Sequence, residues 1–172
     1  MQELNAIIIG FRGTGKSSVA DLIAMCTNRT ALHMDEEIVK RAGSPIPEIV
    51  RNYGWETFWD LESLVATEAS MLRNSVIDTG GGVIRRHTNM EQLKATGRVF
   101  WLTAEIDTIK ERLSDQTDRP SLTGKKSFLD EVEEVLQGRI PLYRMYADYE
   151  VRTDGRTVSE IANEVVHLLC GE

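Results

Sequence analysis

The sequence predicts an α/β protein in which helices cover both faces of a five-stranded parallel sheet. Short apolar runs rich in β-branched residues alternate with longer segments whose apolar residues recur at three- and four-residue steps, the order expected of consecutive βαβ units. The 172 residues, of which 41% are hydrophobic, suffice for one domain with a full core, so we expect a single domain over residues 1–172. The predicted strands are Ala6–Ile9, Ala31–Met34, Ser75–Asp78, Arg98–Leu102 and Tyr149–Arg152.

Two apolar stripes predict helices that pack on this sheet. The first helix is expected over 56–73, and the second begins after Thr157 and runs to the end of the chain. Thr157 and Glu160 form the S/T-x-x-E pattern of a capping box, which fixes the start of the second helix. The stripes consist of Phe58, Leu61, Val65, Ala69 and Leu72, and of Val158, Ile161, Ala162, Val165 and Leu169.

Composition excludes several classes of partner. A net charge of −7 and a pI of about 5.1 argue against nucleic acid and anionic membranes, which bind basic surfaces. No apolar run approaches the roughly 20 residues that span a bilayer, and the first residues do not resemble a signal peptide, so we expect a cytoplasmic monomer with a small-molecule substrate. Cys26 and Cys170 lack metal-site spacing and are expected to be reduced packing residues.

A polar stretch at 114–126 interrupts the alternation between two helical patterns, and it contains Arg119, Pro120 and Gly124. Loops of this length inside a compact domain are usually functional, most often as lids. We expect a lid loop here; a surface loop without a function is the alternative.

The first predicted strand runs into Gly10-Phe-Arg-Gly-Thr-Gly-Lys-Ser17, which matches G-x-x-x-x-G-K-[ST] and precedes a helical pattern. Glycines let successive backbone N–H groups turn toward phosphate oxygens, and the helix N-terminus adds partial positive charge. This P-loop predicts ATP and Mg²⁺ as ligands, with Lys16 on the β- and γ-phosphates and the Ser17 hydroxyl on the metal. The expected nucleotide-binding residues of the loop are Gly10, Gly13, Thr14, Gly15, Lys16, Ser17 and Ser18.

A P-loop alone does not separate kinases from GTPases or motors. No Asn-Lys-x-Asp guanine motif is present, and 172 residues leave no room for a motor apparatus. A small-molecule kinase fits the size of the chain.

Beyond the P-loop, further residues resemble the shikimate kinase family across nearly the whole chain. They are Gly80-Gly81-Gly82 after the third strand, Arg119-Pro120, Arg139 with Leu142-Tyr143, and Gly43, Glu48-Ile49, Gly54, Phe58 and Glu62 at the family's spacing. The resemblance implies a nucleoside-kinase-like P-loop NTPase fold with strand order 2-3-1-4-5 and a substrate-binding region over 33–65. It also implies ATP-dependent phosphorylation of shikimate to shikimate 3-phosphate in aromatic amino-acid biosynthesis.

Arg139 combines a charge with a core-facing position. It shares a helical face with Val132, Leu136 and Tyr143, where a cation needs an anionic partner. The resemblance implies that Arg139 binds the substrate carboxylate, a role that suits a bidentate guanidinium. The alternatives are an arginine that reaches solvent from the edge of the core and one that pairs with a structural carboxylate.

Gly80, Gly81 and Gly82 follow a strand at the carboxyl edge of the sheet, where α/β proteins bind ligands. Three glycines let a substrate lie against the backbone; a tight strand-to-helix turn is the alternative. Arg119 is expected to close onto the phosphates and stabilise charge on the transferred group. The resemblance also makes Arg112 an adenine contact, with a solvated helix-face arginine as the alternative.

The chain departs from the family at His33-Met34-Asp35, where two aspartates separated by one residue are expected. Asp35 matches the second, which contacts substrate hydroxyls, and would orient or deprotonate the attacking hydroxyl. His33 replaces the first, which is associated with magnesium through water, and an imidazole is a poor Mg²⁺ ligand. Asp78 ends an apolar run as in a Walker B strand, so we hypothesise that it takes the outer-sphere role at Mg²⁺; capping of the following turn is the alternative.

A second departure is Trp59, which stands where the family has an arginine of its carboxylate clamp. Loss of one arginine should weaken carboxylate recognition by a few kcal/mol, since charge-assisted hydrogen bonds contribute roughly 1.5 to 3 kcal/mol each. Trp59 either belongs to a weakened or different substrate site or packs at the edge of its helix.

These observations predict an ATP-dependent shikimate kinase. His33 and Trp59 favour, as an alternative, a kinase of the same fold that acts on another polyol, sugar acid or cyclic alcohol. A non-catalytic nucleotide-binding module is a third interpretation. The presence of Lys16, Asp35, Arg119 and Arg139 argues against it.

Overall fold

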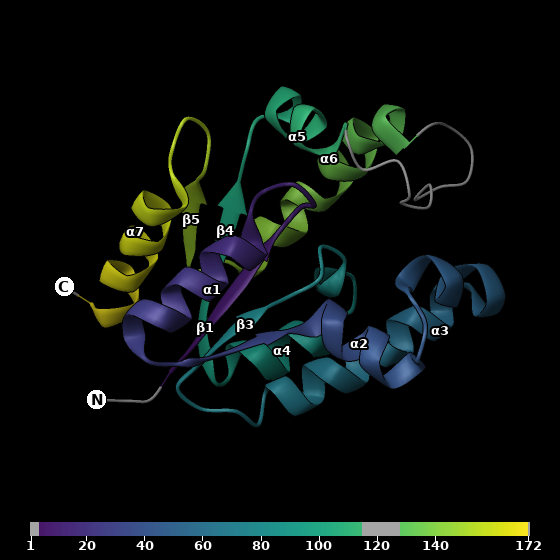
Figure 1. The fold of residues 1–172 in the computed structure, drawn as a ribbon, viewed down its shortest axis with the longest axis horizontal. Helices are drawn as coiled ribbons and strands as arrows, with labels where there is room; N and C mark the ends of the chain where they lie inside the picture. The colour runs from purple at the N-terminus through teal and green to yellow at the C-terminus, as the bar shows by residue number, and fades with distance from the viewer. Residues whose placement is uncertain (1–3, 115–127, 172) are drawn as a thin grey trace.

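The computed structural model describes residues 4–114 and 128–171, which form alternating strands and helices (Figure 1). The strands are β1 (Asn5–Gly10), β2 (Thr30–His33), β3 (Ser75–Asp78), β4 (Gly97–Thr103) and β5 (Tyr149–Arg152). The helices are α1 (Lys16–Thr27), α2 (Met34–Ala42), α3 (Ile46–Ala69), α4 (His87–Lys94), α5 (Ile106–Leu113), α6 (Phe128–Tyr146) and α7 (Val158–Cys170), with a 3₁₀ turn η1 (Val83–Arg85).

The five strands form one parallel sheet in the order β2-β3-β1-β4-β5, which confirms the predicted fold class and strand order. β1 is central and buried along its whole length, with Ile8 opposite Asp78 of β3 and Phe100 of β4. Because parallel strands end at the same edge, the P-loop after β1 and the glycines after β3 lie side by side.

Helices cover both faces of this sheet, because the side chains of β1 alternate between two cores. Ile7 and Ile9 pack with apolar residues of α2, α3 and α4, whereas Ala6 and Ile8 pack with those of α1 and α7. Figure 1 shows α1 and α7 together on one side of the sheet and α3 and α4 on the other.

The strand predictions hold with one correction of position. β3 and β5 have the predicted bounds, and β1 and β4 extend one residue further at each end. β2 was misplaced by one residue, because Met34 is the first residue of α2 and not the last of the strand. The buried Met34 side chain is followed by three acidic residues, which favour the first turn of a helix through its dipole.

The helix predicted over 56–73 is wrong at both ends. α3 begins at Ile46 and contains a break at Gly54, where a φ of 83° lies in the left-handed region that glycine tolerates. It ends at Ala69, since the following residues turn back toward β3, and Asn74 reaches a φ of 54° there. Leu72 therefore lies in this turn, where its carbonyl accepts a hydrogen bond from the Asn5 side chain at 2.8 Å.

The predicted capping box of α7 is confirmed. The Glu160 backbone N–H donates to Thr157 Oγ1 at 3.2 Å, and the Thr157 backbone N–H donates to Glu160 Oε2 at 2.8 Å. Two of the backbone donors at the helix start are thereby satisfied.

Both cysteines are free, as expected, but the prediction that they pack in the interior is wrong, because Cys26 and Cys170 lie on exposed helix faces. Within residues 4–114 and 128–171, none of the helices combines the length and apolar character required to cross a membrane. The predicted cytoplasmic location and monomeric state stay predictions.

Candidate active site

A cavity of about 790 Å³ opens at the carboxyl edge of the sheet between the P-loop, α2, α3 and the glycine turn after β3. Its P-loop half is formed by Arg12, Gly13, Gly15, Lys16, Ser17, Ser18, His33 and Asp78. Its α3 half is formed chiefly by Asp35, Trp55, Trp59, Glu62, Gly80, Gly81, Gly82, Arg85 and Arg139. Most predicted site residues therefore meet in one volume; Gly10, Thr14 and Arg112 lie outside its wall, and Arg119 and the lid from residue 115 onward lie outside the described residues.

The P-loop needs its glycines for steric reasons. A Cβ on Gly10 would lie 2.5 Å from the Leu102 carbonyl oxygen, and one on Gly13 would lie 3.2 Å from Leu113 Cγ. Gly15, at a φ of 86°, precedes the first turn of α1, whose free N–H groups form an anion site. These constraints favour a loop that holds phosphate.

Contacts beneath the P-loop hold it in shape. Phe11 is buried against α5 and α6, and its carbonyl oxygen accepts hydrogen bonds from Thr14 Oγ1 at 2.8 Å and Lys16 Nζ at 3.1 Å. The Thr14 side chain therefore supports the loop from below, while Ser17 and Ser18 are exposed toward the cavity.

Asp78 is the centre of a polar cluster at the ends of β2 and β3. Its Oδ2 accepts a hydrogen bond from Ser17 Oγ at 2.7 Å and lies 2.8 Å from His33 Nδ1. The other ring nitrogen of His33 lies 2.8 Å from Asp21 Oδ1 on α1. Burial lowers the pKa of His33, but hydrogen bonds to Asp78 and Asp21 outweigh this and raise the pKa above its usual value.

The Ser17 and Asp78 side chains fit Mg²⁺ held together with a nucleotide. Both offer hard oxygen donors, and Asp78 Oδ1 is buried without a hydrogen-bond partner among residues 4–114 and 128–171. That part of the chain contains no group of three His, Cys, Asp or Glu residues that could hold a metal alone. Phosphate oxygens and water would therefore complete the coordination.

Two carboxyl groups converge on Gly80 in the α3 half. A Cβ on Gly80 would lie 2.8 Å from Asp35 Oδ1 and 2.9 Å from Glu62 Oε1, so a larger residue would displace them. Glu62 is buried, and burial followed by the charge of Asp35 raises its pKa to about 8. Glu62 therefore holds a proton at neutral pH, whereas Asp35 on α2 is exposed.

Arg139 ties α6 to the glycine turn. Its Nη1 donates to the Gly81 carbonyl oxygen at 3.1 Å, and the Tyr143 hydroxyl donates to the same oxygen at 2.5 Å. Its guanidinium carbon lies 5.6 Å from the centroid of the Phe11 ring. No ion pair joins Arg139 to a carboxylate elsewhere in the described chain, which argues against the structural-pair alternative.

The comparisons with known proteins agree with this geometry. A shikimate kinase family profile matches residues 12–170. The chain belongs to the shikimate kinase family. Curated shikimate kinases of Thermodesulfovibrio yellowstonii and Rhodopirellula baltica are 38% and 39% identical, covering 94% and 92% of this chain and 92% and 87% of their own lengths.

Solved structures of the family superpose closely on this fold. Shikimate kinase from Acinetobacter baumannii in complex with shikimate has a TM-score of 0.92 at 29% identity, covering 98% of this chain and 93% of that chain. The enzyme from Aquifex aeolicus has a TM-score of 0.84 at 30% identity over 98% of this chain and 97% of that chain. The protein is therefore an ATP-dependent kinase of the shikimate kinase family that acts on an alcohol acceptor.

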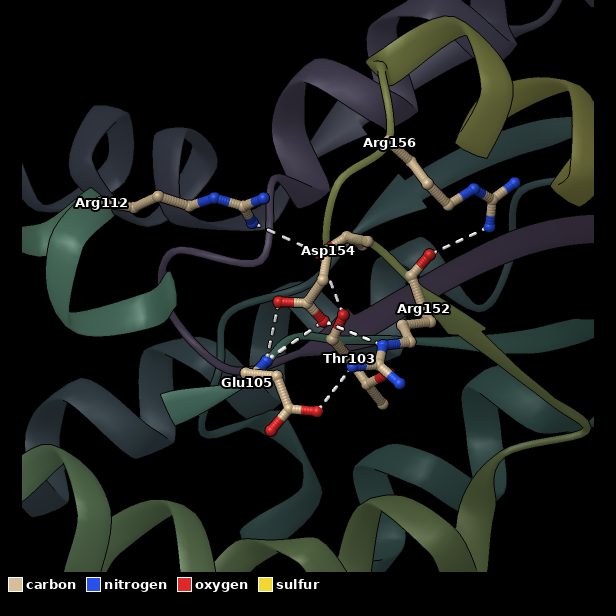
Figure 2. A network of polar contacts seen from close by, with 7 residues as sticks. Thr103, Glu105, Arg112, Arg152, Asp154 and Arg156 are labelled. Atoms are coloured by element: carbon tan, nitrogen blue, oxygen red, sulfur yellow. Dashed lines mark hydrogen bonds and ion pairs between the residues drawn. The ribbon is translucent and has the colours of Figure 1, made fainter. Parts of the chain in front are cut away.

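Arg112 contacts the P-loop from outside the wall of the cavity. Its Nη1 donates to the Gly13 carbonyl oxygen at 2.9 Å and to Thr153 Oγ1 at 3.3 Å, so it is anchored and not merely solvated. Figure 2 shows the neighbouring network, in which Asp154 accepts hydrogen bonds from the Glu105 backbone N–H at 3.0 Å and from Arg152 at 3.3 Å. The loops after β4 and β5 are thus joined beside the P-loop, and the adenine contact of Arg112 stays a prediction.

Sequence reasoning missed two side chains of the α3 half as site residues. Glu62 follows Phe58 by one helical turn, so its burial could have been read from the apolar stripe. Arg85 lies with its guanidinium carbon 4.0 Å from the centroid of the Trp59 ring, in a turn for which the sequence offers no periodic pattern. Trp59 stacks on Trp55 at 6.0 Å, so it both packs and lines the cavity.

Proposed function

We propose that this protein transfers the γ-phosphoryl group of ATP to a ring hydroxyl of shikimate and forms shikimate 3-phosphate for aromatic amino-acid biosynthesis. The observation that carries the proposal is that one cavity holds Lys16 of the P-loop, Asp35 of α2 and Arg139 of α6. The cavity therefore offers Lys16 to the phosphates of the donor, Asp35 to the attacking hydroxyl and Arg139 to the carboxylate of the acceptor.

The P-loop half binds the nucleotide in this proposal. Backbone N–H groups before α1 face the phosphates, and Lys16 contacts the β- and γ-phosphates. Ser17 and Asp78 would hold Mg²⁺, Ser17 through its hydroxyl and Asp78 in the outer sphere; when bound, the ion neutralises phosphate charge. Arg119, in the proposed lid at 114–126, stabilises charge on the transferred group.

The α3 half binds the acceptor. Asp35, which lies beside Gly80 in the cavity, accepts a hydrogen bond from the attacking hydroxyl and takes its proton. Gly80, Gly81 and Gly82 let the ring lie against the backbone, and Arg139 binds the carboxylate. We assign residues 1–172 to one kinase domain whose acceptor-binding region spans 33–65.

A coupled ADP-release assay with ATP, Mg²⁺ and millimolar shikimate tests the proposal. We expect shikimate-dependent ADP release by wild type and its loss in Lys16→Ala and Arg139→Ala. Arg98→Gln changes an exposed arginine on β4 far from the cavity and should keep full activity. A wild type that binds ATP and releases no ADP with shikimate would overturn the proposal.

A related acceptor is the second candidate, and Trp59 favours it. Trp59 puts an apolar side chain into the wall of the α3 half where the family has an arginine, so residue 59 contributes no cation to acceptor binding. A panel of polyols, sugar acids and cyclic alcohols in the same assay would show whether another acceptor has a higher kcat/KM than shikimate. Steady turnover with any of them would exclude a non-catalytic nucleotide-binding module.

A further inference from the structure

Two guanidinium side chains meet above Gly82 although they come from separate elements. A Cβ on Gly82 would lie 3.7 Å from Arg85 Cδ of η1 and 3.9 Å from Arg139 Nη2 of α6. Both side chains line the cavity. The side chains of Arg85 and Arg139 therefore both border the space beside Gly82, Arg85 with its Cδ and Arg139 with its Nη2.

Trp59 fixes the position of Arg85. The guanidinium carbon lies 4.0 Å from the indole centroid, close enough for cation–π attraction and stacking. The indole is held in turn by Trp55, whose ring is inclined by only 23°. Stacking occupies one face of the guanidinium and leaves its N–H donors at the edge free to bind a ligand.

Of the two consecutive arginines Arg85 and Arg86, Arg85 is the one whose guanidinium can bind a ligand. For its guanidinium, the described part of the chain provides neither a hydrogen bond nor an ion pair within 4.0 Å. The next residue, Arg86, is used fully: it donates to the Trp59 carbonyl oxygen at 3.1 Å and pairs with Glu56 at 3.1 Å and Asp60 at 2.8 Å. Arg86 thus fastens η1 to α3, while Arg85 points to the cavity.

Two neighbouring cations need an anion between them. Partial burial lowers the pKa of Arg85, and the charge of Arg139 lowers it further, so the two groups repel each other. The charges of Glu62 and Glu56 offset these effects only in part, since the pKa of Arg85 stays below its usual value. A ligand carboxylate between the two guanidiniums would relieve this repulsion and accept hydrogen bonds from both.

We propose that Arg85, positioned by the indole of Trp59, forms with Arg139 a two-guanidinium site for the carboxylate of the acceptor. The inference rests on the proposed function in so far as shikimate supplies that carboxylate. Trp59 then has a positioning role in carboxylate binding. It stands where the family has an arginine, and its indole holds the guanidinium of Arg85 at the wall of the same cavity.

Titration calorimetry on the full chain, with shikimate and its methyl ester as probes, tests this assignment. In Arg85→Gln we expect the Kd for shikimate to rise by about ten- to a hundredfold, the range that one charge-assisted hydrogen-bonding group contributes. The Kd for the methyl ester should be high in wild type and the same in Arg85→Gln. Arg85→Lys, which keeps the charge and loses the fork, should fall between the two.

Controls separate this effect from loss of structure. Arg98→Gln removes an equal charge from exposed β4 and should bind shikimate like wild type, and all variants should keep the wild-type Kd for ATP. An Arg85→Gln variant that binds ATP normally and shikimate as tightly as wild type would overturn the inference and leave the proposed function intact.

A second carboxylate separates the inference from the proposed function. If wild type fails to bind shikimate but binds quinate, and Arg85→Gln loses that binding, the inference stands and the proposed function falls. If wild type binds neither acid more tightly than its methyl ester, both fall.

Discussion

Glu62 places a carboxyl group inside the wall of the α3 half, beside the charge of Asp35. Burial first, and Asp35 second, raise the pKa of Glu62 from about 4.5 in the unfolded chain to about 8. The folded state therefore holds the proton more tightly, so the stabilisation from this group is complete below pH 4.5 and is lost as the pH rises through 8. We expect Glu62→Gln to remove this loss.

Urea unfolding of both proteins from pH 5 to pH 9 measures the effect. The free energy of unfolding of wild type should fall relative to that of Glu62→Gln by a few kcal/mol over this range, since each pKa unit corresponds to about 1.4 kcal/mol. Glu48→Gln, an exposed change on the same helix, is the matched control. A constant difference between wild type and Glu62→Gln across the range would contradict the expectation.

Asp78 carries the prediction about magnesium. Its carboxylate accepts from Ser17, and its second oxygen is buried without a hydrogen-bond partner in the described chain. Removal of an outer-sphere group typically weakens metal binding by about 10- to 100-fold, so Asp78→Asn should raise the Mg²⁺ concentration for half-maximal turnover in that proportion. Initial rates at fixed ATP and varied Mg²⁺ measure it.

Asp21→Asn is the control for an effect transmitted through His33, because the exposed Asp21 side chain on α1 contacts the other ring nitrogen of His33. We expect it to leave the Mg²⁺ dependence close to wild type. An unchanged Mg²⁺ dependence in Asp78→Asn would remove the hypothesis and leave Asp78 as a capping residue.

Site residues that belong to sequence motifs could be predicted from the sequence. Site residues that are positioned by contacts with a distant side chain could not. Lys16, Asp35 and Arg139 stand at fixed spacings, and the structure brings them to one cavity. Arg85 depends on a stacking partner 26 positions earlier, since it lies over Trp59 only after η1 folds back on α3. A contact of that kind has no periodicity along the chain.

Among the elements, α7 offers the sharpest stability test because its boundary was predicted and is confirmed. Thr157 accepts a hydrogen bond from the Glu160 backbone N–H, so Thr157→Ala leaves that donor without its partner. The expected cost is about 1 kcal/mol, within the usual range for loss of an N-cap. Chemical denaturation at neutral pH measures it.

Ser159→Ala in the same exposed turn is the matched control and should change the free energy of unfolding little. An equal loss in both variants would show that the capping hydrogen bond of Thr157 does not set the stability of this turn.

The strands were predicted more accurately than the helices for a physical reason. Buried parallel strands are short apolar runs with polar ends, so their limits are visible, as at Ser75–Asp78. The limits of α3 depend on the break at Gly54 and on the turn at Asn74, which tertiary packing determines. An apolar stripe indicates which face of a helix is buried, and Leu72 continued that stripe beyond the helix end.

Over the whole molecule, the two halves of the cavity share α6 and are otherwise supported by different elements. The P-loop half is supported from β1, α1, α5 and the loop after β5, whereas the α3 half is supported from α2, α3 and η1. Substitutions in one set should therefore change the KM of one substrate and leave that of the other. The effect on each KM of a contact outside the cavity can therefore be predicted from the half that the contact supports.

Arg112 tests the division because it touches neither carboxylate nor hydroxyl sites of the α3 half. It joins α5 to the Gly13 carbonyl oxygen and to Thr153, so Arg112→Ala releases the P-loop from the loop after β5. We expect the KM for ATP to rise by about tenfold, the lower end of what a hydrogen bond to a charged group contributes, with the KM for shikimate unchanged. Lys110→Ala on the same helix, which breaks only a surface pair with Glu133, should leave both KM values as in wild type. Initial rates with each substrate varied in turn decide the matter, and an equal rise of both KM values in Arg112→Ala would mean that the two halves deform together.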